Sequence, residues 1–505
     1  MLRAIALLLL SFSLFAEDKE AALKLLESAA EIAATARPEV QVFALMHLGS
    51  AYDEIDDVKS IRYLRQAFSV AAAAPEDIRE TLRGEVVSAL ADVSLPDAIE
   101  LLRSMPEPAT NLEMGFSAIE RVVVLLLEDS EFDRAAEVIG LVPESAAYPF
   151  QAANKLFEKL PKDDPRRVLV FGRALSAYKR AASGEFTELL WKHWRVVPRE
   201  MADAAVQAVV NAVQANKDSS YSWTIGDDGK VVMNGKQTTE LSQLYHVLNE
   251  LDPNRAQKLA ASNAAIKAAS AQPPQEKKEA EPPQEGFSAD DFSPPASMFR
   301  FEGSLETNGF LEKFTNWFKQ NDKAESILKT AETELQTALS QISELTYDSL
   351  QAETMCKIAR KSAAKDRQTG RNLFEKCMTA IGDIKNPLDR MSAMLDAAEA
   401  AYALKQKDTS IEAFRKALAS ASEAYTRESG AEMVNQVLRE YWPSVQFGRV
   451  IAWRAGKLLG SEAEPLLHEV REPDVNVLCR IEMALALMGE STTVHHMGFR
   501  FSKTN

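Results

Sequence analysis

The chain contains little cysteine, few aromatic residues and no recognisable metal-binding cysteine pair. Its 505 residues include three cysteines, Cys356, Cys377 and Cys479, and aromatic residues make up 8%. Three cysteines are too few for a framework of several disulfides. None of them stands in a C-x-x-C pattern, which excludes zinc and thioredoxin-like motifs. Cys356 and Cys377 fall on neighbouring predicted helices, so a disulfide between them is one interpretation. We favour the alternative, that both are small core residues.

The sequence motifs of common catalytic sites are also missing. There is no H-E-x-x-H, no P-loop, no dinucleotide-binding fingerprint and no G-x-S-x-G elbow. Two Ser-x-x-Lys matches, Ser326 with Lys329 and Ser362 with Lys365, lack the accompanying motifs and are interpreted as surface coincidences. Asp227-Asp228-Gly229 lacks the alternating ligands of a calcium loop and is interpreted as a turn.

Histidines and tryptophans give no clear site either. The six histidines are scattered, at His47, His193, His246, His468, His495 and His496. Trp191 and Trp194 lie three residues apart on one predicted helix, where core packing is favoured over an anchor for a partner peptide. We therefore predict a protein without catalytic, cofactor-binding or metal-binding residues, and without a cofactor.

The charge balance is acidic. Lys and Arg number 58 against 74 Asp and Glu, which gives a formal net charge of -16, and no basic stripe interrupts the acidic surface. Such a surface repels phosphate groups, so nucleic acids and anionic membranes are not expected partners. The 46% hydrophobic and 26% charged residues are typical of a soluble globular protein.

Residues 1–16 read as a cleavable secretory signal. Arg3 gives one positive charge, the residues from Ala4 to Phe15 are apolar apart from two serines, and Ala16 precedes a charged run. This pattern is typical of signal peptides, and the apolar part is too short to span a membrane. The alternative is a buried N-terminal helix. We expect an exported protein, periplasmic or secreted, without an integral membrane span.

Three segments in the first third of the chain align without gaps. They start at Ser60, Ala98 and Ala135, 38 and 37 residues apart, and each has a small residue, a large aliphatic four positions later and another apolar residue three after that. This spacing places the three residues on one face of a helix. An amphipathic helix precedes each, over 40–52, 77–93 and 111–128, so the predicted unit is a helical hairpin.

The same pattern returns later in the chain and resembles a known repeat family. Segments starting at Gly370 and Ser410 match it, preceded by predicted helices over 350–364 and 388–404. The small-aromatic-small-large-small-Pro series of the first unit resembles the tetratricopeptide repeat signature; it consists of Gly49, Tyr52, Ser60, Leu64, Ala67 and Pro75. Residues 474–487 resemble the second helix of a HEAT-type repeat. These resemblances imply an all-α solenoid of stacked helical hairpins.

The remaining segments set the expected domain boundaries. Two β-rich runs around Asp-Asp-Gly predict a β-hairpin near 221–233 within the helical array. Residues 271–299 are rich in Pro and Glu and are predicted to be a disordered linker. We therefore expect an N-terminal lobe over 17–270, a C-terminal lobe over 300–490 and a polar tail over 491–505.

A solenoid of this kind offers an extended surface suited to recognition of proteins or peptides. The first hypothesis is therefore a non-enzymatic scaffold that mediates protein–protein interaction in the cell envelope. One alternative is a cell-wall-associated enzyme or accessory protein with an unrecognised site between the lobes. Another is a structural envelope component that works through self-association. The sequence does not specify the partner or the oligomeric state.

Overall fold

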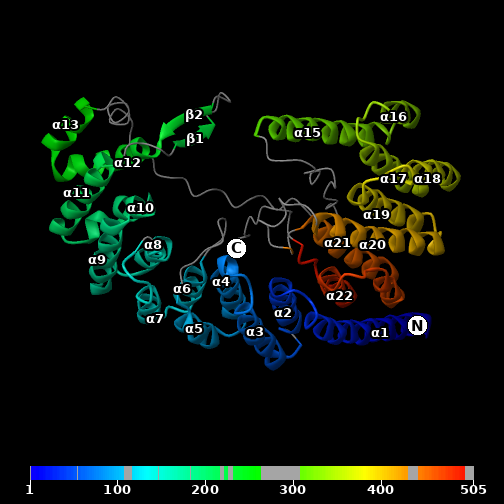
Figure 1. Ribbon diagram of the computed structural model, residues 1–505, viewed down its shortest axis with the longest axis horizontal. Coiled ribbons are helices and arrows are strands. Elements are labelled where there is room, and N and C mark those ends of the chain that lie inside the picture. The colour runs from blue at the N-terminus through cyan, green and yellow to red at the C-terminus, as the bar shows by residue number, and fades with distance from the viewer. Residues whose placement is uncertain are drawn as a thin grey trace. The chain divides into compact units, whose positions relative to one another are not determined.

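A computed structural model shows an almost entirely helical chain (Figure 1). It describes residues 2–53, 55–106, 117–145, 147–181, 184–215, 221–225, 231–262, 307–429, 439 and 442–494. Within these residues 21 α-helices pack in neighbouring pairs, an arrangement compatible with an α-solenoid. The helices expected over 40–52, 77–93, 350–364 and 388–404 appear there, with ends that differ by at most two residues. Of the helix expected over 111–128, residues 111–116 lie outside the described residues, and the described part begins at Ala118.

The described residues divide into two units of contacting helices, one built from those within 2–75 and 307–494 and the other from those within 76–262. The helices of the first unit are α1 (Leu2–Ala33), α2 (Pro38–Tyr52), α3 (Asp57–Ala71), α15 (Thr307–Thr330), α16 (Leu335–Ile342), α17 (Asp348–Lys365), α18 (Arg367–Gly382), α19 (Pro387–Ala403), α20 (Lys407–Ser429), α21 (Pro443–Leu459), the 3₁₀ segment η6 (Gly460–Glu469) and α22 (Pro473–Met488).

The second unit contains the elements α4 (Glu76–Val93), α5 (Leu95–Ser104), α6 (Ala118–Glu128), α7 (Phe132–Ile139), α8 (Phe150–Lys159), α9 (Pro165–Arg180), α10 (Gly184–His193), the 3₁₀ segment η1 (Trp194–Val196), α11 (Arg199–Ala215), β1 (Tyr221–Ile225), β2 (Val231–Gly235), α12 (Lys236–Leu251) and α13 (Pro253–Ser262). Strands β1 and β2 pair antiparallel, with Tyr221 opposite Gly235. They lie where the sequence predicts a β-hairpin.

The boundary between the units differs from the expected division into lobes. We expected the N-terminal lobe to begin at residue 17, but residues 1–75 group with the C-terminal half because α1 and α2 pack against α22. The second unit is thus inserted between two parts of the first. The predicted linker over 271–299 lies outside the described residues.

Small residues explain how the two helices of a hairpin approach each other. A Cβ atom added to Gly49 of α2 would lie 2.7 Å from Cγ of Leu64 on α3. On α20 the small residue is Ser410, whose buried hydroxyl donates a hydrogen bond to the carbonyl oxygen of Ala398 on α19 at 2.8 Å. The residues of the small-large pattern therefore lie where the two helices of a hairpin contact each other.

Local sequence also sets where the helices begin. Proline stands in the first turn of α2, α9, α19, α21 and α22, where its missing N–H costs no hydrogen bond. Asp56 accepts a hydrogen bond from the backbone N–H of Lys59, and Ser117 with Glu120 forms a reciprocal capping box at α6. These caps stop the chain from continuing as one long helix.

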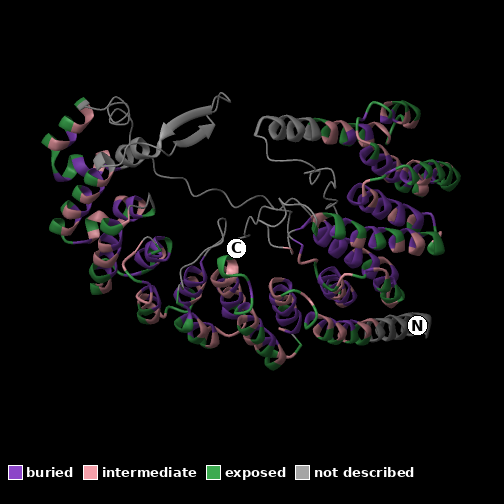
Figure 2. Cartoon of the chain, viewed as in Figure 1, coloured by how far each residue is buried: buried purple, intermediate pink, exposed green. Residues whose placement is uncertain are grey.

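The two helices of a hairpin are buried to different extents. Buried residues occupy most of α19 and α21, whereas α18 and α20 keep an exposed face (Figure 2). Helix α19 is covered by α17, α18, α20 and α21. Polar side chains on α17 and α19 therefore lie inside the first unit, where they must find partners.

Candidate functional site

Helices α17, α19 and α21 carry a row of charged side chains, which we call the charged ladder. It comprises Glu353, Lys357 and Arg360 on α17, Ser392, Asp396 and Glu399 on α19, and Arg454 on α21. Lys357 Nζ lies 3.5 Å from Asp396 Oδ2, and Arg454 Nε lies 3.5 Å from Glu399 Oε1. Arg360 pairs with the same Glu399.

The ladder shows that α17 and α19 are equivalent helices of successive repeats. Glu353 bonds to Ser392, Lys357 to Asp396 and Arg360 to Glu399, and each partner lies 39 residues further along the chain. A constant offset along two neighbouring helices requires that they run parallel and in register. The charges therefore fix the stacking of one repeat on the next.

Burial changes the acid–base behaviour of the ladder. Glu353 and Asp396 are 5% and 4% exposed. Loss of hydration raises the pKa of Glu353 to about 7 and that of Asp396 to about 6, although the nearby Lys357 ammonium opposes both shifts. Asp389, also fully buried, faces Glu353. Two buried carboxyl groups, those of Glu353 and Asp396, therefore share the Lys357 ammonium, and desolvation favours the protonated form of each.

A second buried ion pair joins α21 to α22. Arg449 and Glu482 are each 1% exposed, and Arg449 Nη2 donates to Glu482 Oε1 at 3.0 Å. Glu482 also accepts hydrogen bonds from the hydroxyl of Thr492 and the backbone of Thr493. The residues just after α22, placed in the polar tail by the sequence, are therefore packed, and Val494 is 5% exposed. The rest of the expected tail, 495–505, lies outside the described residues.

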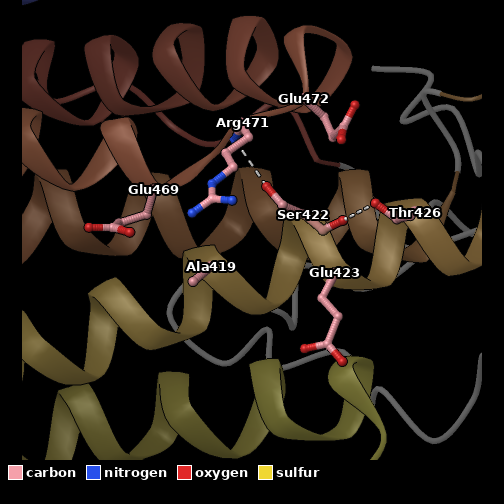
Figure 3. Close-up of a pocket in the computed structure, with 7 residues that line it drawn as sticks. All are labelled: Ala419, Ser422, Glu423, Thr426, Glu469, Arg471 and Glu472. Atoms are coloured by element: carbon pink, nitrogen blue, oxygen red, sulfur yellow. Dashed lines mark hydrogen bonds between the residues drawn. The ribbon is translucent and has the colours of Figure 1, made fainter.

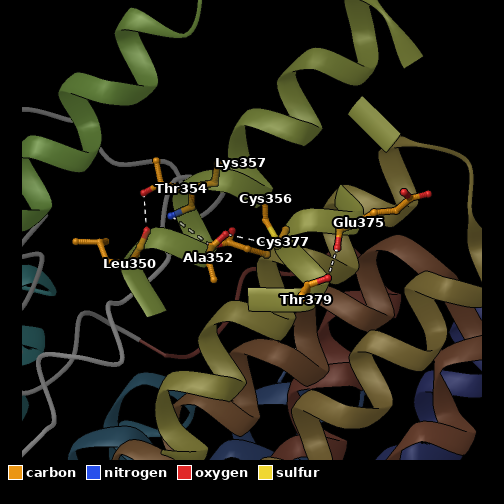
Figure 4. The surroundings of a disulfide bond; sticks show 9 residues. Leu350, Ala352, Thr354, Cys356, Lys357, Glu375, Cys377 and Thr379 are labelled. Carbon is orange, nitrogen blue, oxygen red and sulfur yellow. Dashed lines mark hydrogen bonds and ion pairs between the residues drawn. A yellow bond between two sulfur atoms is a disulfide. The ribbon is translucent and has the colours of Figure 1, made fainter. Parts of the chain in front are cut away.

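Cys356 and Cys377 form a disulfide, contrary to the interpretation we favoured from the sequence. The bridge joins α17 to α18, with Cα atoms 5.8 Å apart, and both residues are fully buried (Figure 4). The sequence could not decide this point, because it depends on which faces the two helices turn toward each other. Cys479 is a buried free thiol on α22.

An open pocket lies between α20 and the start of α22 (Figure 3). It measures about 380 Å³ and is lined by Ala419, Ser422, Glu423, Thr426, Glu469, Arg471 and Glu472. Ser422 Oγ accepts a hydrogen bond from the backbone N–H of Arg471 at 3.0 Å. Glu423 pairs with Arg390 and Glu469 with Arg415, so Glu472 is the lining acid that we assign to a basic side chain of a partner.

The serine–lysine pairs noted in the sequence lie on helix surfaces. Ser326 and Lys329 are exposed on α15, and Lys365 Nζ donates to the backbone carbonyl of Glu332 at 3.1 Å. The two tryptophans do not share one helix, because α10 ends at His193 and Trp194 begins η1. Both are partly exposed, and Arg195 stacks on the Trp194 ring at 4.9 Å.

The described histidines lie apart from one another. His47 on α2 is 3.2 Å from Arg449 Nη2, while His193 on α10 packs on the Phe157 ring with centroids 4.9 Å apart. Burial, together with the charges of Arg167 and Lys192, lowers the pKa of His193 to about 4. Among the described residues no group of His, Cys, Asp and Glu is arranged to hold a metal ion. Asp227-Asp228-Gly229, His495 and His496 lie outside these residues.

Sequence reasoning missed the buried charged groups. Arg449, Glu482, Glu353 and Asp396 were not singled out, although each interrupts a helix made largely of apolar and small residues. A charged residue on the apolar face of a helix indicates a partner on the next helix, since an unpaired buried charge is costly. That signal identifies the residue but not its partner.

No protein-family model matches the chain, and a search of curated proteins finds no relative. In the part of the chain that the structure describes, none of the helices combines the length and apolar character needed to cross a bilayer.

Proposed function

We propose that this protein is an exported, non-enzymatic repeat protein of the tetratricopeptide-like kind that binds a protein partner. The observation that carries the proposal is the similar offset, 33 to 39 residues, between polar partners on neighbouring helices of the array. It is 39 residues in the charged ladder. In the second unit it is 34 between Gln151 and Glu185 and 33 between Arg166 and Asp133.

Regular offsets support a recognition role because stacked hairpins present a repeated outer surface while burying a continuous core. The buried charges of the first unit are engaged in ion pairs between helices, as in Arg449 with Glu482 and Lys357 with Asp396. These groups hold repeats together and leave recognition to surface residues.

Export is supported by the disulfide and by the signal-like N-terminus. Buried structural disulfides persist mainly in oxidising compartments. The α1 side chains that the structure describes as buried run from Ala22 to Ala33, beyond the proposed cleavage after Ala16, so the mature chain keeps them. N-terminal sequencing of protein recovered from the envelope or culture fluid tests this point. A chain that retains residues 1–16 would contradict it.

The pocket between α20 and α22 is the partner-binding site that we propose. Glu472 lines it together with Glu423 and Glu469, and the whole chain carries a net charge of -16. A partner that inserts a lysine or arginine side chain gains charge-assisted hydrogen bonds there. Its binding should weaken as salt concentration rises.

The test is capture of a partner from the producing cells' envelope and culture fluid, with the mature chain as bait and cross-linking with mass spectrometry as readout. The captured protein is then purified and its affinity is measured with Glu472→Gln and with Glu375→Gln. The latter is an exposed acid on α18, outside the pocket. We expect the first change to weaken binding about threefold to tenfold and the second to leave it unchanged. Equal affinities would exclude the pocket, and recovery of glycan without a protein would contradict the scaffold function.

A further inference from the structure

Residues 18–71 close the first unit, and we call them the closing segment. They contain the described side chains of α1 together with α2 and α3. The apolar stripe of α1 is Ala22, Leu25, Leu26, Ala29 and Ala33, each at most 1% exposed. Helix α1 packs along α22 (Figure 1). Helix α22 is buried on most sides because α21 and α1 both cover it.

Polar contacts fix the closing segment in register on the C-terminal helices. The Arg37 backbone N–H donates to Asp474 Oδ1 at 2.9 Å, and the Arg37 guanidinium lies 3.6 Å from the same carboxylate. Arg439 Nε donates to Glu39 Oε1 at 3.0 Å. Arg480 donates to the hydroxyl of Ser28, also at 3.0 Å. The partners are 400 to 452 residues apart in sequence.

The closing segment is a terminal repeat held mainly by this one interface. Within the first unit its principal neighbours are α22 and η6, and α3 packs chiefly on α2. Along the chain it connects to α15–α22 only through residues 76–285, which form the second unit. In stacked-repeat proteins each repeat contacts only its neighbours, so a terminal repeat can open while the others stay folded.

We propose that the closing segment is exchangeable: it opens from α22 as one unit and docks on α22 of a second copy of this chain, giving a reciprocal dimer. A second copy is the fitting occupant because Ser28, Arg37 and Glu39 match Arg480, Asp474 and Arg439. The exchanged dimer repeats every contact of the single chain and needs no new interface. The covalent link favours the closed monomer at low concentration, so the dimer forms as concentration rises.

The experiment mixes unlabelled and ¹⁵N-labelled full-length mature chain over a range of concentrations. The mixture is held just below its unfolding temperature, cooled and then examined by light scattering and cross-linking with mass spectrometry. We expect a dimer fraction that grows with concentration. Its mixed-isotope cross-links should join residues 18–71 of one copy to residues 443–494 of the other.

A pair of matched variants separates opening from general destabilisation. Glu39→Ala removes, from the closing segment itself, the acceptor for Arg439, whereas Asp366→Ala removes the helix cap of α18, which accepts from Gln368. We expect Glu39→Ala to raise hydrogen exchange across 18–71 at least tenfold and to speed isotope mixing. The dimer fraction should stay unchanged, because the same contact is weakened in monomer and dimer. Asp366→Ala should leave exchange in 18–71 unchanged.

Three results would overturn the proposal. The first is a monomer at every concentration with no mixed-isotope links. The second is a dimer whose links avoid α22. The third is hydrogen exchange in 18–71 that is as slow as in 348–429 and changes only on global unfolding.

Discussion

The disulfide between Cys356 and Cys377 gives the sharpest test of the structure. It closes a loop with a sequence separation of 21 residues between α17 and α18. Closing a loop of that length in the unfolded chain stabilises the folded state by about 3 kcal/mol in the chain-entropy model. We expect Cys356→Ala with Cys377→Ala to lower the free energy of unfolding of the first unit by about that amount.

The same change should lower the unfolding temperature of the first unit by on the order of 5 °C, since one kcal/mol corresponds to a few degrees in a domain of this size. Calorimetry with and without reductant measures it. Cys479→Ala is the matched control, because it removes a buried thiol that takes part in no bridge. This variant keeps the bridge, so reductant should lower its unfolding temperature as much as in the parent protein, while the substitution itself should cost only about 1 kcal/mol, that of a small cavity.

Thiol titration of the denatured chain checks the premise directly. The bridge leaves one reactive thiol, Cys479, before reduction and all three cysteines after it. Three reactive thiols before reduction would refute the bridge. An unchanged unfolding temperature in the double variant would refute the loop-entropy reasoning.

Further predictions concern pH and packing. Burial raises the pKa of Glu353 from 4.5 to about 7, so its stabilising contribution is present below pH 4.5 and lost as pH rises through 7. Urea unfolding between pH 4 and 8 measures this loss of stability, and Glu353→Gln should reduce it by about 3 kcal/mol. The pKa of His193 is lowered from 6.5 to about 4, which has the opposite effect, so the second unit should lose about 3 kcal/mol as pH falls from 6.5 through 4, and His193→Gln should remove that dependence. Gly49→Ala should destabilise the first unit by about 1–3 kcal/mol because of the contact with Leu64. Gly382→Ala, which meets no atom within 4 Å, should change stability by less than about 1 kcal/mol. A flat pH profile in the parent protein, or equal effects of the two glycine changes, would contradict these assignments.

The helices and their pairing follow largely from local sequence. Proline in the first turn of α19, the cap at Asp56 and the small-large pattern at Ser410 act within a few residues, so they predict helix starts and contact faces without knowledge of the fold. The repeat offset of 39 residues in the ladder also agrees closely with the spacing of 40 between Gly370 and Ser410 in the sequence pattern.

Regions where the repeat pattern weakens were harder to interpret from sequence. The sequence pattern blurs between residues 147 and 215, yet α8 and α10 are regular neighbours there, joined between Lys192 and Glu158 at an offset of 34. The small-large signature has drifted in these helices, whereas the pairing of charges has kept its register. Charge pairs at a fixed offset are thus a second signal for degenerate repeats.

The sequence by itself determined a predominantly helical, repeat-like protein with an acidic composition and helix ends set by caps and prolines. Only the tertiary structure decided that α1 packs on α22, that Cys356 bonds to Cys377 and that Glu353 and Asp396 share Lys357. The physical reason is distance along the chain. A helix forms from interactions within four residues, whereas its packing partner is selected among all exposed apolar faces, including one more than 400 residues away.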